Sequence, residues 1–149
     1  MGIYYASNNK LLSSSTIMNT VNVASSAYLY VISGGVVSNM TCASAGYTYV
    51  WNGGNVNSAI VSSGGSVLVT SGGTLTNGTI YGSCIVGVGA NVNSFTVTGN
   101  KGSASIYGNA SEVTVAQSGI LYVNNSGTLN NGVASNSGIV SMGSGGTVS

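Results

Sequence analysis

Charged side chains are almost absent from this sequence of 149 residues. Lys10, Lys101 and Glu112 are the only ones, so 2% of the residues are charged, against roughly 25% in an ordinary globular domain. Arginine, aspartate, histidine and proline are missing altogether. With a net charge of +1, the chain has no basic surface that could neutralise phosphates, which argues against nucleic acid as a partner. It also lacks the cationic face of an interfacial membrane helix.

Scarcity of charge does not indicate disorder here. Disordered chains combine high charge with low hydrophobicity, whereas 43% of these residues are hydrophobic. No apolar run reaches the roughly 20 residues of a membrane span. Met1 leads into polar residues rather than a secretory signal. We therefore expect one folded domain, and any export signal is expected to lie outside this sequence.

The missing residue types also remove most catalytic machinery. Without histidine or aspartate there is no catalytic triad and no histidine general base. Glu112 alone cannot form the carboxylate pair of a glycosidase, and calcium-binding repeats need an aspartate at each turn. The sequence therefore predicts no enzyme, no cofactor and no metal site, and we interpret Glu112 as a solvated corner residue.

Glycine doublets are plentiful instead, and they recur at a fixed interval. The pairs 34–35, 53–54 and 72–73 are each 19 residues apart, and the Ser-Gly and Gly-Gly pairs at 126–127 and 145–146 keep this spacing. An aliphatic residue lies two positions after each pair, at Val37, Val56, Leu75, Leu129 and Val148. A fixed period near 20 residues indicates a stack of structural repeats.

Each repeat contains three short alternating runs and no helical spacing. In the run SVLVT, for example, Val67 and Val69 share one face. The sequence therefore predicts an all-β fold, a β-solenoid (parallel β-helix) with rungs of about 19 residues, three short strands per rung and a rung spacing of about 4.8 Å. The glycines are expected at sharp corners, where positive φ is needed and a Cβ would obstruct the next rung. We assign residues 20–149 to the solenoid and residues 1–19 to an irregular N-terminal segment, either a cap or a lid.

The predicted register fixes which side chains face the interior. One interior column is expected to hold Val31, Val50 and Val69, and a second to hold Val37, Val56 and Leu75. Cys42 is expected to face inward, with Cys84 two rungs further on. Two rungs are roughly 9.6 Å, beyond the limit of about 7 Å between the Cα atoms of a disulfide, so both thiols are predicted to be free.

A family resemblance follows from the repeat itself. The stretch VSSGGSVLVTSGGTLTNGTI, residues 61–80, resembles the repeats of AIDA-type autotransporter adhesins, which are self-associating and host-adhering bacterial surface proteins. The resemblance spans about residues 20 to 149 and implies a secreted β-helical passenger. The family's signal peptide and outer-membrane barrel are not in this sequence, so we expect either a fragment of a longer protein or a solenoid that stands alone.

Aromatic residues form the one non-periodic feature that points to a site. If Val31 and Val50 face inward, strand alternation turns their neighbours outward. The predicted binding residues are Tyr28, Tyr30, Tyr47, Tyr49 and Trp51, with Ile32 beside them. Such a patch would cover roughly several hundred Å², a size typical of interaction sites, and its rings suit sugars and protein contacts. The alternative is that residues 1–19 lie across the patch.

These observations predict a non-enzymatic cell-surface adhesin or self-association module, built as a β-helical stalk and located outside the cell or on a bacterial surface. Its expected partners are further copies of itself, as in biofilms, and host or bacterial surface glycans or proteins, because few charges leave little repulsion between chains. An alternative is a structural subunit of an extracellular filament that assembles by end-to-end stacking of solenoids. Ice binding is a third and weaker alternative, because the sequence shows no regular column of Thr-x-Thr pairs.

Overall fold

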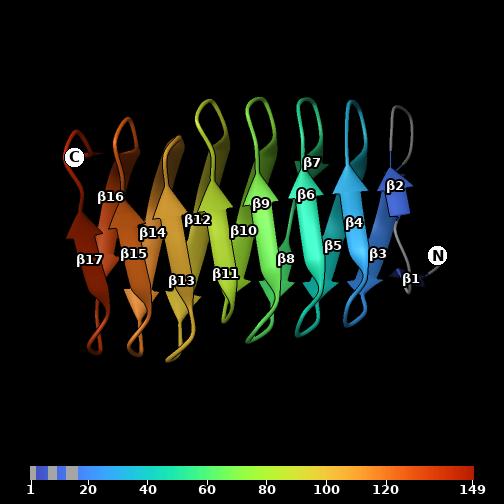
Figure 1. Cartoon of the computed structure of the whole chain (residues 1–149), viewed down its shortest axis with the longest axis horizontal. Helices are drawn as coiled ribbons and strands as arrows, with labels where there is room; N and C mark the ends of the chain where they lie inside the picture. The colour runs from blue at the N-terminus through green and yellow to red at the C-terminus, as the bar shows by residue number, and fades with distance from the viewer. Residues whose placement is uncertain (1–2, 7–9, 13–16) are drawn as a thin grey trace.

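The computed structural model describes the backbone of residues 3–6, 10–12 and 17–149, and the side chains of residues 17–149. These residues form a parallel β-solenoid of about seven turns with a spacing of about 19 residues, and they contain no helix. The predicted fold class is therefore confirmed. In Figure 1 the rungs lie side by side along the longest axis, with the N-terminal rungs at the right. Over the described ranges, no helix long and apolar enough to cross a membrane is present.

Two parallel sheets make up the solenoid, and they lie one behind the other in Figure 1. The long-strand sheet contains β1 (Ile3–Ala6), β3 (Ile17–Val23), β5 (Val36–Cys42), β7 (Asn55–Val56), β8 (Ala59–Val61), β10 (Thr74–Ile80), β12 (Asn91–Thr98), β14 (Asn109–Ala116), β16 (Thr128–Ala134) and β18 (Thr147–Val148). The short-strand sheet contains β2 (Lys10–Leu12), β4 (Tyr28–Val31), β6 (Tyr47–Val50), β9 (Ser66–Val69), β11 (Ser83–Val86), β13 (Ser103–Ile106), β15 (Ile120–Val123) and β17 (Ile139–Met142).

The three runs predicted for each rung lie in two strands in most rungs. Two of the runs join into one long strand that bends at a corner, because pairing with the neighbouring rungs continues on both sides of the bend. The corner residue of β10 is Asn77, at φ 57°, and the same column continues through Ser94, Glu112 and Asn131. Among the described residues, the corner breaks the strand in the rung where β7 and β8 are separate.

The glycine doublets have two separate structural causes. Gly72 has φ +75°, a left-handed conformation that a side chain disfavours. Gly73 is restricted by space, because a Cβ at this position would clash with the backbone carbonyl oxygen of Val50 on the preceding rung. The first position of the pair needs the left-handed conformation, and the second has little room for a side chain. These two demands explain the recurring doublets, although Ala90 and Ser126 stand in place of glycine in two rungs.

Aliphatic columns fill the space between the two sheets. Both predicted interior columns are confirmed, since their six residues are completely buried and are paired in register: Val31, Val50 and Val69 in one, and Val37, Val56 and Leu75 in the other. Burying one such side chain stabilises the fold by about 1.5–3 kcal/mol. Because both columns continue through successive rungs, the core fixes the register of both sheets and so the outward direction of the alternate residues.

The described residues of the N-terminal segment belong to the sheets. β1 pairs with β3, and β2 pairs with β4, both in parallel. The solenoid pairing therefore begins before residue 20, and these residues are not irregular; no glycine doublet marks these rungs in the sequence. β2 extends the sheet beside β4 and does not cross its outer face. The predicted cap or lid also involves residues 1–2, 7–9 and 13–16, which lie outside the described residues.

Candidate functional site

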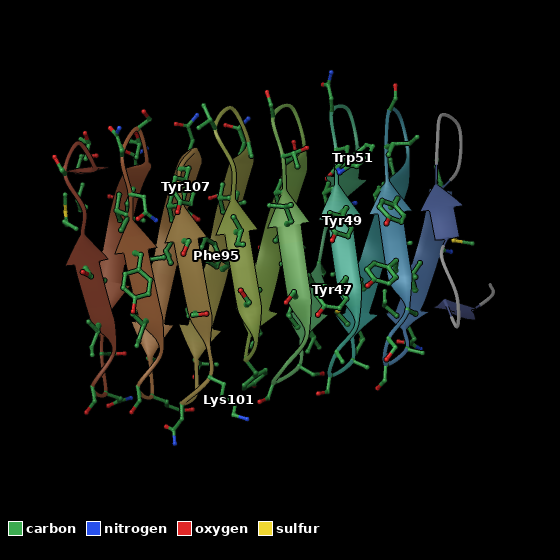
Figure 2. All side chains as sticks on the ribbon, in the orientation of Figure 1. Tyr47, Tyr49, Trp51, Phe95, Lys101 and Tyr107 are labelled. Atoms are coloured by element: carbon green, nitrogen blue, oxygen red, sulfur yellow. The ribbon has the colours of Figure 1, made fainter. Side chains whose placement is uncertain are left out.

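The predicted aromatic residues gather on the outer face of β4 and β6. Strand alternation puts the neighbouring residues of both strands into the core and turns Tyr28, Tyr30, Tyr47 and Tyr49 outward. Trp51 directly follows β6 on the same face, and Figure 2 shows Tyr47, Tyr49 and Trp51 following one another along this rung. We call these five residues the tyrosine platform.

Parallel pairing in register stacks the rings of the platform along the solenoid. Tyr28 is paired with Tyr47, with ring centroids 5.2 Å apart and planes 12° apart. Tyr30 is paired with Tyr49, at 5.0 Å and 9°. Trp51 packs its edge against Tyr30 at 5.8 Å and 75°. Offset-stacked and edge-to-face contacts are the favoured geometries for aromatic rings, so each ring holds its neighbour in place.

The platform is accessible from solvent. Tyr47 is 37% exposed and Trp51 is 46% exposed, and the other three side chains are partly exposed. Burial raises the pKa of Tyr49, and repulsion from the phenolates of Tyr30, Tyr28 and Tyr47 raises it further. The phenol of Tyr49 therefore stays neutral at physiological pH and can both donate and accept hydrogen bonds.

A shallow hollow adjoins the platform on the side toward the C-terminus. Here the aromatic columns stop, because Tyr47 is paired with Ser66 and Tyr49 with Leu68. The two tyrosines, Ser66, Leu68 and Ile85 line the hollow. The sequence reasoning missed it, although the signal was present in the change from tyrosine to serine in the column that continues from Tyr28.

A second surface, on the long-strand sheet, was also missed from the sequence. It is a polar groove lined by Thr74, Asn91, Asn93, Asn109, Ser111 and Asn130, with Val92 and Ala110 between its walls. Side chains of adjacent rungs bond along it: Asn109 Nδ2 donates to Asn91 Oδ1 at 3.1 Å, and Ser111 Oγ donates to Asn93 Oδ1 at 2.8 Å. The side-chain oxygens of Asn91 and Asn93 therefore already accept hydrogen bonds within the groove. The signal in the sequence was a polar residue directly after the corner pair, such as Thr74 after Gly72-Gly73 and Asn91 after Gly89-Ala90.

Glu112 lies at the corner of β14, where the sequence analysis placed it. It is exposed, and its carboxylate accepts a hydrogen bond from the hydroxyl of Ser94 in the neighbouring rung. No group of three or more His, Cys, Asp or Glu side chains lies together within the described residues.

Both cysteines are buried and free, as predicted. Burial raises the pKa of the Cys84 thiol to about 12. Burial also raises the pKa of Cys42, and a backbone hydrogen bond with Ser66 partly opposes that rise. Since the thiolate is the reactive form, both cysteines act as small core residues in the folded protein.

Comparison with known proteins relates the chain to a solved structure. No family model matches the sequence, and no curated protein matches it. Among solved structures, the chain is similar to the crystal structure of the TibC-catalysed, hyper-glycosylated TibA55-350 fragment, with 27% sequence identity and a TM-score of 0.65. The match covers 95% of this chain and 60% of that fragment, so the chain corresponds to only part of the TibA fragment.

Proposed function

We propose that the chain is a non-enzymatic adhesin or self-association module of the bacterial cell surface, built as a β-helical stalk. Two observations support this. The repeats resemble those of AIDA-type autotransporter adhesins, and the fold is similar to that of the TibA fragment. In a solenoid each rung contacts only its neighbours, so the stack presents a long surface on which equivalent positions recur. Such an extended surface can contact another protein or a cell surface at several rungs.

The observation that carries the proposal is the exposed tyrosine platform. Aromatic side chains are enriched at the centres of protein interfaces, and contiguous exposed aromatic surface marks interaction sites. The platform lies on a flat sheet face in a chain with three charged side chains, so two copies can approach without strong repulsion. The proposed partners are further copies of this chain, and glycans or proteins of host or bacterial surfaces.

Analytical ultracentrifugation of a platform variant tests this proposal. Changing Tyr30, Tyr49 and Trp51 together to Ser should weaken self-association while the circular dichroism spectrum stays that of a β-protein. Tyr122→Ser is the matched control, since Tyr122 is exposed on β15 of the same sheet, away from the platform. Unchanged association of the triple variant would contradict a role for the platform. If association were unchanged and the melting temperature fell further than the loss of the ring contacts accounts for, residues 1–19 would be the cover of the platform, as the alternative predicts.

The alternative function is a filament subunit that assembles end to end. β17 and β18 are outermost in their sheets, so a strand of the same chain or of another copy can pair with their free edges. Electron microscopy separates the two functions: long single-width fibres favour end-to-end stacking, whereas dispersed or laterally bundled rods favour the adhesin module.

A further inference from the structure

The stacking order leaves one pair of platform ring faces open. The ring of Tyr28 stacks on one face of Tyr47, and the ring of Tyr30 stacks on one face of Tyr49. On the opposite side, the next rung offers Ser66 and Leu68 instead of rings. The sides of Tyr47 and Tyr49 that no ring covers therefore point toward β9, where the hollow lies between them, Ser66 and Leu68.

The hollow lies where the column of Tyr28 and Tyr47 would continue into the next rung. Serine is much smaller than tyrosine, so the place that the next ring of the Tyr28–Tyr47 column would fill is vacant above Ser66. Leu68 and Ile85 add apolar surface beside it. None of the lining residues is charged, so the hollow offers nothing with which to pair an anionic or cationic group. A neutral ring with one apolar face suits these surroundings.

Hydroxyl groups continue from the hollow along the solenoid. Ser66, Ser83 and Ser103 are paired in register on the outer face of three successive rungs, all partly exposed. Successive rungs are about 4.8 Å apart. The surface thus combines aromatic faces at one end with a row of hydroxyls beside it. An aromatic side chain would use only the faces, whereas a sugar has apolar C–H groups for the faces and hydroxyls for the row.

We propose that the hollow between Tyr47, Tyr49 and Ser66 binds one sugar ring of a neutral glycan, which stacks on the open tyrosine faces and extends along the serine column. This inference rests on the proposed adhesin function and specifies the ligand class for the same face. The stacked rings behind Tyr47 and Tyr49 hold the two faces in place, so little ordering is needed when the sugar binds.

Saturation-transfer NMR with defined sugars tests the proposal. The test ligands are neutral trisaccharides of glucose, galactose, mannose and N-acetylglucosamine, with trigalacturonic acid as the acidic comparison. We expect at least one neutral trisaccharide to bind the wild-type chain, and trigalacturonic acid to bind at least tenfold more weakly. Binding of none of the neutral sugars, or preference for the acidic one, would overturn the proposal.

Two variants place the binding in the hollow. Ser66→Tyr extends the aromatic stack into the vacant position, and the double change of Tyr47 and Tyr49 to Ala removes its wall without adding bulk. Each should lower affinity for the neutral trisaccharide at least tenfold, while Tyr122→Ala on β15 leaves it unchanged. Equal loss in the Tyr122 control, or unchanged affinity in both hollow variants, would overturn the assignment. The double alanine variant keeps the test valid if Ser66→Tyr does not fold.

Self-association measured on the same samples separates this inference from the function on which it rests. If no sugar binds but association persists and is lost in Ser66→Tyr, the hollow receives a side chain of a second copy; the glycan inference then fails and the self-association module stands. If the chain neither binds any sugar nor associates, both are overturned.

Discussion

Tyr30 and Tyr49 lie on adjacent rungs with their ring centroids 5.0 Å apart and their planes 9° apart, although 19 positions separate them in the sequence. The contact follows directly from parallel pairing in register, which puts residues one repeat apart beside each other. A side chain that recurs with the repeat therefore contacts the equivalent side chain of the next rung, and the energy of this contact can be measured.

A double-mutant cycle measures the contribution of this pair to stability. Tyr30→Ala, Tyr49→Ala and the double variant should give a coupling of about 0.5–1.5 kcal/mol in urea unfolding, as expected for stacked rings. The control cycle combines Tyr30→Ala with Tyr122→Ala on the distant strand β15, and its coupling should be zero within about 0.5 kcal/mol. Equal coupling in the two cycles would argue against a direct contribution from the stack.

Salt should have little effect on self-association. Interactions between exposed charges weaken when salt screens them, whereas hydrogen bonds and apolar contacts persist. Lys10, Lys101 and Glu112 are the only charged side chains. Sedimentation velocity in low and near-molar sodium chloride should therefore give similar distributions. A steep loss of association with salt would point to a charged partner or modification instead.

Val69→Asp tests the interior register. Val69 is completely buried in its column, and an unpaired charge at this position should destabilise the fold by several kcal/mol. Val88→Asp is the matched control, because the Val88 side chain is 64% exposed and its replacement should change stability little. Thermal melts followed by circular dichroism compare the two variants, and equal melting temperatures would contradict the register.

Gly73→Ala tests the explanation of the glycine doublets. The added methyl group would clash with the carbonyl oxygen of Val50, and a destabilisation of about 1–3 kcal/mol is expected. At Gly78 an added Cβ would be 3.5 Å from the Cβ of Phe95, an ordinary contact, so Gly78→Ala serves as the control and should cost less. Urea unfolding measures both variants. If Gly78→Ala proves the more harmful, close approach of the rungs does not explain the second glycine.

Cys84 should make stability depend on pH in the alkaline range. Its pKa is about 12 in the folded chain because of burial, against about 8.5 when exposed. Above pH 8.5 the unfolded thiol loses its proton while the folded thiol keeps it. The contribution of the thiol to the unfolding free energy is therefore fully present below pH 8.5 and is lost as the pH rises toward about 12. Unfolding free energies between pH 8 and 11 should fall more steeply for the wild type than for Cys84→Ala. Parallel curves would show that the thiol does not contribute.

Sequence periodicity was sufficient to predict the interior columns and the outward aromatic residues. The spacing of 19 residues fixes which positions meet, and alternation fixes which face they occupy, so Val31 and Tyr30 could both be placed. The joining of two runs at Asn77 was not visible, because hydrophobic alternation carries no information on whether backbone pairing continues through a bend. The strands β1 and β2 were missed because no glycine doublet marks them.

The hollow and the polar groove depended on differences between rungs rather than on the repeat. A search for periodicity averages over such differences. Serine at position 66 interrupts the repeated pattern of tyrosines, and in the structure it leaves one face of the Tyr47 ring without a stacked neighbour. The side-chain bonds along the groove, such as that from Ser111 to Asn93, likewise depend on which polar residue stands on each rung.

Pairing between residues one repeat apart also has a consequence for the gene. Recombination between two copies of the repeat inserts or deletes one whole rung, and the strands on either side of the junction can pair again with the same partners. Each such event changes the length of the solenoid by about 4.8 Å and moves the tyrosine platform along the axis without altering it. Variation in length among alleles should therefore occur in whole repeats, while changes of one or two residues inside a strand should be rare.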